Sequence, residues 1–300
     1  MEPLVAAGVA LHLGDVRERA SMREGMSGAD WVVHAAADLD LDGPPGRMEA
    51  VNVEGSENVA SLAFKLGVGR LLSVSSVAYF GGSPEDGSAA VEDSPPRLPF
   101  PTRYSATKHA GERAIRAWAA RGLAVHTVYP SLVYGPPGKR EGANALLHQL
   151  ARGQFPALVG ADRIASWVFL DDVVDGIVRV MAQAAPGSAH LLAGEALSVR
   201  ELARKVAALS GVPAPRREVS VATARWALRL GRPLLRLAGR RPPKAASQLR
   251  SLARHWNFDD GRARRELTWR PRPLDEGLPP TLRETSGLPN SGSASAPPSS

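Results

Sequence analysis

The segment Arg70-Leu71-Leu72-Ser73-Val74-Ser75-Ser76 decides the fold of this 300-residue chain. Its apolar first part predicts a short buried strand, and the two serines mark the point where that strand ends. Helical patterns flank the segment: residues 48–66 precede it and stop at Gly67, and residues 104–121 follow it and stop at Gly122. Helices that alternate with strands of about five residues indicate crossover connections, and therefore an α/β fold with a parallel sheet.

The same alternation continues on both sides of this segment. From Ser198 onwards the pattern becomes mostly helical, with proline-rich breaks. Residues 286–300 consist almost entirely of Ser, Gly, Pro, Ala and Asn, so they cannot bury apolar area and are expected to be disordered. Further strands are predicted at residues 9–13, 31–34, 123–128, 166–170 and 189–192, and further helices at residues 17–26 and 171–183.

Composition excludes several classes of protein. The chain is 44% hydrophobic and 22% charged, which is typical of a globular protein and not of a disordered one. It has no cysteine, so disulfides, cysteine metal sites and thiol nucleophiles are excluded, and no metal site is expected. No run of about 18 apolar residues is present, so no membrane-spanning helix is predicted. The residues from Met1 to Val5 do not resemble a signal peptide, and we expect a cytoplasmic protein.

Charge is unevenly distributed along the chain. The net charge is +7, but residues 198–272 alone carry 19 Lys and Arg against five Asp and Glu. Such a basic segment indicates either an anionic partner or a solvated arginine-rich face. Within residues 221–241 the arginines fall on one face of a predicted helix, which makes a peripheral contact with an anionic membrane surface one hypothesis. Nucleic acid is not expected as a partner, because neither interleaved exposed aromatic residues nor a nucleic-acid-binding motif is present.

Tyr104 and Lys108 carry the chemistry that the sequence predicts. They lie four residues apart on a predicted helix and therefore share one face. A lysine ammonium beside a phenol favours the phenolate and lowers the tyrosine pKa, which suits a general acid or base for an alcohol–ketone pair. The serines Ser75 and Ser76 end a strand, and in open α/β sheets ligands bind at the carboxyl ends of the strands. We therefore expect a serine hydroxyl and Tyr104 to act on the same substrate oxygen.

These motifs together resemble the extended short-chain dehydrogenase/reductase superfamily, also called the NAD-dependent epimerase/dehydratase family. The resemblance runs from about residue 9 to residue 283. Residues 256–259, 263–267 and 271–274 are most similar to the dihydroflavonol-reductase-like and 3β-hydroxysteroid-dehydrogenase-like branch. The other matching segments are Gly14-Asp15-Val16, His34-Ala35-Ala36-Ala37, Asn52-Val53-Glu54-Gly55, Ser75-Ser76-Val77-Ala78, Tyr104-Ser105-Ala106-Thr107-Lys108, Tyr129-Pro130-Ser131-Leu132-Val133-Tyr134-Gly135-Pro136 and Trp167-Val168-Phe169-Leu170-Asp171-Asp172-Val173-Val174.

The resemblance implies a Rossmann-like parallel sheet with a smaller C-terminal substrate lobe. Residues 1–197 would form the NAD(P)-binding domain, with residues 137–165 contributing to the substrate lobe. Residues 198–285 would form the mostly helical remainder of that lobe, and residues 286–300 the tail. The resemblance also implies a small-molecule substrate, NAD or NADP as cofactor, and a homodimer.

The resemblance assigns roles to the matching residues. Tyr104 is expected to be the catalytic acid or base, and Lys108 to bind the nicotinamide ribose and tune Tyr104. Ser76 is expected to polarise the substrate oxygen, with Ser75 as the second choice. Of the cofactor residues, Asp15 would hold the adenine, the alanines would pass the pyrophosphate, and Pro130 and Val133 would border the nicotinamide. The full cofactor set is Asp15, Val16, Ala35, Ala36, Ala37, Asn52, Ser75, Tyr104, Lys108, Pro130 and Val133.

Several of these residues also have a purely structural interpretation. Asp15 is suited to cap the helix that follows it, because a carboxylate at that position accepts free backbone N–H groups. Asn52 is suited to be a buried hydrogen-bonding residue on its helix. The three alanines from Ala35 to Ala37 are suited to close packing.

One part of the family pattern is absent from residues 1–300. The family opens with a strand, a Gly-x-x-Gly-x-x-Gly turn and a helix, which places the pyrophosphate on a helix N-terminus. Neither Gly81-Gly82 nor Gly135-Pro136-Pro137-Gly138 lies in that context. We therefore expect a sheet that is incomplete at its N-terminal side, with a gap where the first strand would lie. Either the coding sequence begins upstream, which we favour, or the chain is a degenerate copy without cofactor binding.

Three functions remain open from the sequence. The first is NAD(P)-dependent oxidoreduction at a secondary alcohol or ketone of a sterol-like, polyprenoid or flavonol-like molecule. The second is epimerisation or dehydration of a nucleotide sugar, whose diphosphate the basic lobe would neutralise. The third is a binding module without a cofactor.

Overall fold

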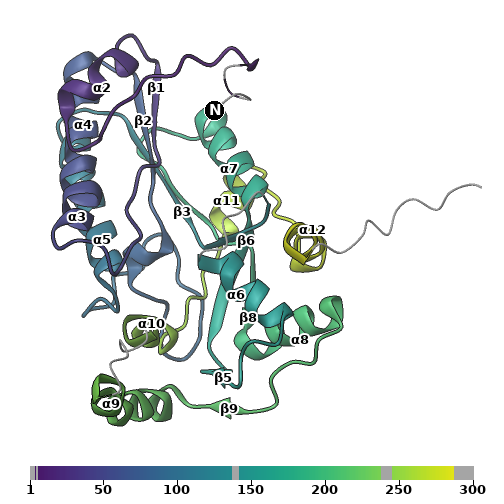
Figure 1. The fold of residues 1–300 in the computed structure, drawn as a ribbon. Helices are drawn as coiled ribbons and strands as arrows, with labels where there is room; N and C mark the ends of the chain where they lie inside the picture. Colours follow the sequence, from purple (N-terminus) through teal and green to yellow (C-terminus); the bar gives the residue numbers. More distant parts are fainter. Residues whose placement is uncertain (1–3, 5, 137–141, 238–244, 287–300) are drawn as a thin grey trace, which may run out of the picture.

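The structure, a computed structural model, describes residues 4, 6–136, 142–237 and 245–286. The predicted tail over residues 287–300 therefore lies outside the described residues. Figure 1 shows a larger α/β body that contains the N-terminal strands, joined to a smaller body of short strands and helices.

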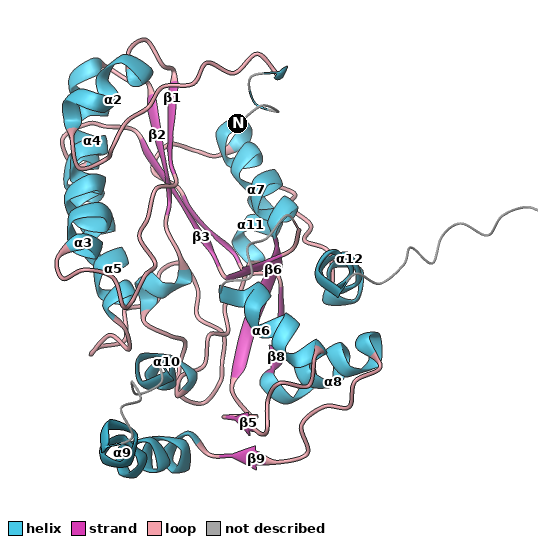
Figure 2. Ribbon diagram, in the orientation of Figure 1, coloured by secondary structure: helices cyan, strands magenta, loops and turns pink. Residues whose placement is uncertain are grey.

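Four parallel strands form the main sheet, in the order β1-β2-β3-β7. They run through the middle of the larger body, with helices on both sides (Figure 2). The predicted α/β fold with a parallel sheet is confirmed, and three of these strands have the predicted bounds at both ends. The strands are β1 (Trp31–His34), β2 (Arg70–Val74), β3 (Val125–Pro130) and β7 (Ala189–Leu192).

Each face of this sheet is buried against its own helices, because successive residues of a strand point to opposite faces. Leu71 packs with Leu62 and Ile115 in one cluster, whereas its neighbour Leu72 packs with Val180 and Trp269 in another. The helices of the first face are α2 (Arg19–Met26), α3 (Arg47–Glu49), the π-helical turn η1 (Ala50–Glu54), α4 (Gly55–Leu66) and α5 (Arg103–Ala119), and those of the second are α7 (Leu170–Gln183) and α11 (Gly261–Glu266).

The smaller body has a core of its own, built on Tyr134, Trp167, Phe169, Leu202 and Leu278. Its strands form a three-stranded sheet in the order β4-β6-β8 and a separate pair of β5 with β9. The strands are β4 (Leu132–Tyr134), β5 (Leu158–Val159), β6 (Ile164–Phe169), β8 (Glu195–Ser198) and β9 (Glu218–Val219). The helices are α6 (Gly142–Ala151), α8 (Val199–Ser210), α9 (Val221–Leu237), α10 (Ala245–Leu252) and α12 (Leu274–Ser286).

A C-terminal segment, residues 254–272, returns from the smaller body to the main sheet. Trp256 bridges to Ala165 of β6, and two residues later Phe258 bridges to Ala90. Further on, the indole of Trp269 is fully buried among the residues on the second face of the main sheet, and its Nε1 donates to the carbonyl of Asp172 at 2.7 Å. The two bodies therefore share this segment.

The strand predicted at residues 9–13 is wrong: these residues are irregular and largely exposed. A cavity of about 400 Å³ separates them from β1, with Ala10, His12 and Gly14 on one side and Val32 and Val33 on the other. The outer strand of the described sheet, β1, lies across this cavity, and the segment is not paired with it. A strand needs such a neighbour for its N–H and C=O groups, which explains why the apolar pattern alone failed here.

Candidate active site

Tyr104 and Ser76 are brought together at the carboxyl end of β2. Helix α5 begins at Arg103, and Thr102 caps it by accepting a hydrogen bond from the Ser105 amide at 3.1 Å. Tyr104 is therefore held in the first turn of the helix. Ser76 caps the short helical turn η2 (Val77–Phe80), and its side chain lies close enough to the phenol of Tyr104 to influence its pKa as a hydrogen-bond partner. Burial raises the pKa of Tyr104 above its usual value, and this interaction opposes that rise.

Lys108 lies one turn along the same helix and is half-buried. Its Nζ donates to the carbonyl of Val74, the last residue of β2, at 3.1 Å. Burial lowers the pKa of Lys108 to about 8, and the nearby negative charge of Glu112 works in the opposite direction. Burial, and then the positive charge of Lys108, lower the pKa of His34 to about 4. The lysine charge is not among the effects that set the pKa of Tyr104, so the expected lowering of that pKa is not observed.

Ser75 takes part in a different arrangement from Ser76. Its Oγ donates to Oε2 of Glu112 at 2.7 Å, while Tyr129 Oη and the guanidinium of Arg116 donate to the other carboxylate oxygen. Glu112 is only 3% exposed, so its charge is balanced almost entirely by these partners. Ser75 thus belongs to a buried network under the site, and Ser76 to the site itself.

Sequence reasoning missed Glu112. The signal was present, because a carboxylate four residues after Lys108 must lie on the helix face that carries Tyr104 and Lys108. What the sequence does not show is that Ser75, Arg116 and Tyr129 converge on this carboxylate.

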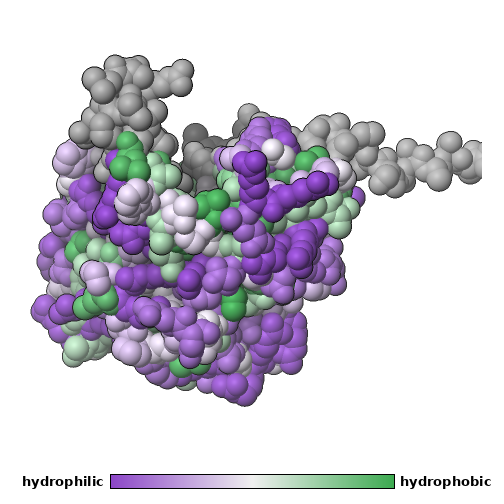
Figure 3. Space-filling view, turned by 90° about the horizontal axis from the view of Figure 1, so that it is seen from below, coloured by the Kyte–Doolittle hydropathy of each residue, from purple (hydrophilic) through white to green (hydrophobic). Residues whose placement is uncertain are grey.

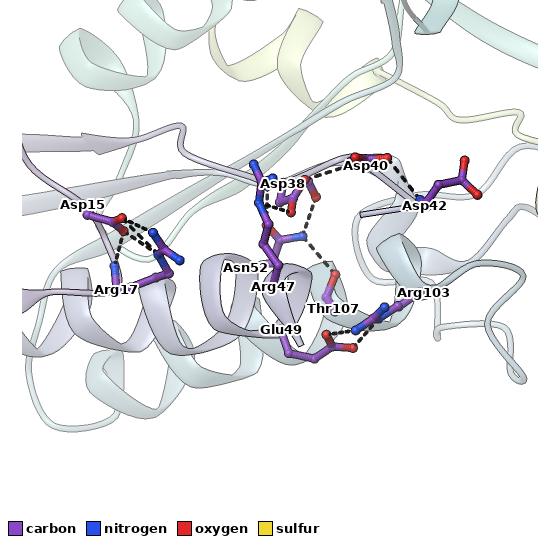
Figure 4. Close-up of polar contacts among 10 residues, drawn as sticks. All are labelled: Asp15, Arg17, Asp38, Asp40, Asp42, Arg47, Glu49, Asn52, Arg103 and Thr107. Atoms are coloured by element: carbon purple, nitrogen blue, oxygen red, sulfur yellow. Dashed lines mark hydrogen bonds and ion pairs between the residues drawn. The ribbon is translucent and has the colours of Figure 1, made fainter. Parts of the chain in front are cut away.

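Asn52 joins the loop after β1 to helix α5 (Figure 4). Its side-chain Oδ1 accepts from the Asp38 amide at 2.7 Å, and its Nδ2 donates to the Asp38 carbonyl at 2.9 Å and to Thr107 Oγ1 at 3.0 Å. Asn52 is only 2% exposed. It is therefore the buried hydrogen-bonding residue of the structural interpretation, and its partners lie next to Lys108 and directly after the three alanines.

The residues predicted at the adenine end border the 400 Å³ cavity. Val16, Ala35 and Ala36 line it. Asp15 instead pairs with Arg17, which forms two hydrogen bonds from Nε and one from Nη2 and lowers the pKa of Asp15 to about 2 (Figure 4). Asp15 does not cap the following helix, whose N-cap residue is Glu18. Its Oδ1 accepts from the amide of Arg17 in a local turn.

The remaining predicted residues lie beside the main sheet. Pro130 is the last residue of β3 and is opposite Leu192 of β7. Val133 lies in β4, half-buried against the cluster that contains Leu72. Ser131, between them, donates its hydroxyl to the Ala193 carbonyl at 2.6 Å, which fixes the turn from β3 into β4.

Three features test whether these residues fit a nicotinamide dinucleotide. Tyr104, Ser76 and Lys108 meet at the carboxyl ends of parallel strands, where ligands of such sheets bind. The cavity between Val16 and Ala36 is large enough for part of a nucleotide. Oδ2 of Asp38 is buried without a hydrogen bond among the described residues, although Arg47 Nε lies 3.2 Å away. The residues present therefore fit the nicotinamide and ribose end, and residues 1–300 contain no glycine-rich turn for the pyrophosphate.

Comparison with known proteins agrees with this geometry. The model of the NAD dependent epimerase/dehydratase family matches residues 2–194. Sterol demethylase protein B of Methylococcus capsulatus is 30% identical over 85% of this chain and 78% of its own length. The 2-alkyl-3-oxoalkanoate reductase of Stenotrophomonas maltophilia is 27% identical over 92% of this chain and 86% of its own length. The solved structure of a DesIV double mutant, a dTDP-glucose 4,6-dehydratase from Streptomyces venezuelae with NAD bound, is 26% identical with a TM-score of 0.70, over 91% of this chain and 79% of that one.

The chain belongs to the NAD-dependent epimerase/dehydratase family, which is the extended short-chain dehydrogenase/reductase type that the sequence resembles. The expected class, an NAD(P)-dependent enzyme with a Rossmann-like sheet, is confirmed at this level.

Proposed function

We propose that the protein interconverts a secondary alcohol and a ketone with NAD(P), and that Tyr104 moves the proton. The observation that carries this proposal is that the hydroxyls of Tyr104 and Ser76 lie together at the end of β2, with Lys108 one turn away. Two hydroxyl groups in contact form a donor pair for one substrate oxygen. A bound nicotinamide supplies or accepts the hydride.

Substrate polarisation, proton transfer and cofactor binding are assigned to separate residues of the chain. Ser76 polarises the substrate oxygen, and Tyr104 gives its proton to that oxygen when a ketone is reduced. Lys108, with its lowered pKa of about 8, binds the ribose from its place one turn further along the same helix. Asn52 holds the loop of Ala35–Ala37 at a fixed distance from the helix that carries both catalytic residues.

The relatives support a carbonyl on an apolar molecule as substrate. One relative is a 2-alkyl-3-oxoalkanoate reductase and another is a sterol demethylase protein, and both match most of this chain. We therefore propose a lipid-like ketone or alcohol, bound between the main sheet and the smaller body that is built around Tyr134, Trp167 and Leu202.

Replacement of Tyr104 by Phe tests the mechanism. The change removes one hydroxyl, so we expect turnover of a lipid-like ketone to fall by about 10²- to 10⁴-fold while the melting temperature stays close to the original. Tyr134→Phe is the matched control, because its buried hydroxyl has no hydrogen-bond partner among the described residues. Retained activity in Tyr104→Phe, or an equal loss in the control, would contradict the assignment.

A substrate panel separates this function from the other two hypotheses. Oxidoreductase activity predicts consumption of NADPH or NADH with oxoalkanoates or sterol ketones, and none with nucleotide sugars. Turnover of nucleotide sugars without net change in the cofactor would favour the epimerase or dehydratase. A chain that shows no thermal shift with any of the four nicotinamide dinucleotides would favour the binding module, since a ligand of the native state must raise its melting temperature.

Helix α9 supports a second proposal, a peripheral contact with anionic membranes. Trp226 and Leu230 are 66% and 60% exposed on this helix, and Arg225 and Arg229 beside them are exposed too. Among the residues that the structure describes, no helix is long and apolar enough to cross a membrane. Seen from the side on which α9 lies, the apolar surface forms small separate patches within a mostly hydrophilic face (Figure 3). The contact that we propose is therefore electrostatic and shallow.

Co-sedimentation with vesicles tests this contact. We expect binding to vesicles rich in phosphatidylserine at low salt and none to neutral vesicles, with loss of binding in the double variant Arg225→Gln and Arg229→Gln. Absence of binding to the anionic vesicles overturns the proposal. Side chains from residue 231 to residue 241, which complete the predicted arginine stripe, lie outside those that the structure describes.

A further inference from the structure

A second cavity, of about 320 Å³, lies outside the site of Tyr104. Its lining contains three guanidinium groups and one imidazole but only one carboxylate, and none of these residues belongs to the proposed catalytic or cofactor set. Most of the lining comes from two places: the residues just before β6 and those just after α10. The lining residues are Glu85, Arg97, Arg163, Ala253, Arg254 and His255.

The imidazole of His255 faces two hydrogen-bond donors at once. The backbone N–H of Ile164 lies 3.1 Å from Nδ1, and Nη1 of Arg163 lies 2.8 Å from Nε2. A neutral imidazole has only one nitrogen that accepts, so one of these contacts sets two N–H groups against each other whichever tautomer is present. His255 is 7% exposed, so water has little access to relieve this opposition.

The backbone contact is the one that is fixed in place. Ile164 belongs to β6, and its carbonyl accepts from the Trp256 amide at 2.8 Å, so Ile164 and the chain next to His255 are held together. Nδ1 is therefore the accepting nitrogen, and Nε2 carries the proton. Nε2–H and the Arg163 guanidinium then point their donors at the same place.

Arg163 itself has a donor without an acceptor. Its Nε is buried and has no hydrogen-bond partner among the described residues. Its other neighbour is Asp162, an exposed residue whose Oδ2 is 3.7 Å from Nη2. A buried donor left unpaired destabilises the fold, and does so more strongly where the group is charged. An acceptor bound in this cavity would pair with the free donor of Arg163. It would also accept from the two donors that face each other at Nε2 of His255.

Two further arginines make the cavity electropositive. Arg254 is anchored by donating to the carbonyls of Gly81, Arg97 and Pro99, and Arg97 donates to the carbonyl of Ser83. These acceptors are neutral, so they fix the guanidinium groups without balancing their charge. Burial and the charge of Arg97 lower the pKa of Arg254. The one carboxylate, Glu85, pairs with Arg97 but is almost fully exposed at the rim.

We propose that this cavity binds a phosphate group, held by Nε2 of His255 and the guanidinium of Arg163 within the field of Arg97 and Arg254. A phosphate offers several acceptor oxygens and up to two negative charges, which matches converging donors better than a single-charge carboxylate does. The cavity is larger than one phosphate ion, so the phosphate monoester of a small organic molecule fits its volume.

Calorimetric titration of the full chain with inorganic phosphate tests the site. We expect saturable binding at one site, and at least about tenfold weaker binding in Arg163→Met, because a charge-assisted hydrogen bond of about 1.5–3 kcal/mol is lost. Arg217→Gln is the matched control: it removes one exposed arginine of the same lobe outside the cavity, and we expect it to leave the affinity unchanged. Equal weakening in both variants, or no saturable binding in the original chain, overturns the proposal.

Two additions keep the test decisive. His255→Leu is a second variant in case Arg163→Met does not fold, as judged by its melting curve, and it should weaken phosphate binding as well. Titration with phenyl phosphate then distinguishes the sources: tighter binding than inorganic phosphate supports a phosphorylated metabolite, and equal binding supports the free ion. The assay needs neither NAD(P) nor turnover, so its result is independent of the oxidoreductase proposal.

Discussion

The side-chain amide of Asn52 donates a hydrogen bond to the hydroxyl of Thr107 at 3.0 Å, across 55 positions of sequence. Thr107 precedes Lys108 on α5, and the same Asn52 side chain holds both backbone groups of Asp38. One buried amide therefore sets the distance between the loop after β1 and the helix of the catalytic pair. Both elements belong to the proposed cofactor site.

Asn52→Ala is expected to destabilise the fold and weaken cofactor binding together. The change leaves the Asp38 amide and carbonyl buried without their partner, at a cost of about 1–3 kcal/mol each. Urea unfolding measures the stability, and fluorescence titration with NADH and NADPH measures the affinity. Asn58→Ala is the control, because Asn58 also donates to a backbone carbonyl, that of Val16, but is half-exposed and water can replace it. Equal losses in the two variants would count against a special role for Asn52.

Gly111→Ala is expected to push α5 away from η1. A Cβ at this position would lie 2.1 Å from the carbonyl oxygen of Asn52, a backbone atom that cannot rotate away. Alanine in a helix normally gains about 0.5–1 kcal/mol over glycine, but overpacking of this kind costs about 1–3 kcal/mol, so we expect net destabilisation. In Gly55→Ala, the comparison variant, the new Cβ meets the side chain of Val16, which is able to shift. Thermal melting should show a clearly larger loss for Gly111→Ala.

Glu112→Gln is expected to lower the pKa of Lys108 below its value of about 8. In the original protein the negative charge of Glu112 stabilises the Lys108 ammonium, and the variant removes that charge. The chain has only five lysines, so ¹³C-methylation of the lysines followed by NMR titration reports each one, and Lys108→Arg assigns the signal. Glu57→Gln on α4 is the control and should leave the Lys108 titration in place. An unchanged Lys108 titration in Glu112→Gln would show that the network around Ser75 acts on structure alone.

Lys108 also predicts how stability depends on pH. Its pKa is about 8 in the folded protein and 10.5 in the unfolded chain, so between these values the unfolded state binds more protons. Stability should therefore rise as the pH increases from 8 towards 10.5, and the penalty for burying the charge is fully present below pH 8. Lys108→Met should flatten this part of the profile. Urea unfolding across that range measures it, and a parallel rise in the variant would assign the effect to another group.

The parts of the fold that the sequence predicts well are those that local pattern determines. The strands at residues 31–34 and 70–74 have the predicted bounds, because each is a short apolar run between helices. Residues 9–13 have a similar pattern but no adjacent strand, so they remain irregular. The helix predicted over residues 48–66 exists, yet the sequence pattern did not predict its π-helical turn at Ala50–Glu54.

The candidate site divides in the same way. Tyr104 and Lys108 share a face because of their spacing, and Ser76 lies at the carboxyl edge of the sheet because it follows the end of β2. The partners of Asn52, and those of Glu112 apart from Arg116 on the same helix, lie on other elements. They are 14 to 55 positions away for Asn52 and 37 for Ser75 with Glu112. Such convergence depends on how the helices dock, and a single sequence does not contain that information in readable form.

The returning segment over residues 254–272 has a consequence for any attempt to exchange substrate lobes between relatives. A simple cut after β7 would take Trp269 away from the face of the main sheet that it fills, and Phe258 away from its bridge to Ala90. The main sheet of the recipient would lose part of its hydrophobic core, and the chimera would then not fold well enough to acquire the new substrate specificity. A chimera that keeps the host's residues 254–272 and replaces only the chain between β8 and α10 would preserve the contacts of this returning segment with both bodies.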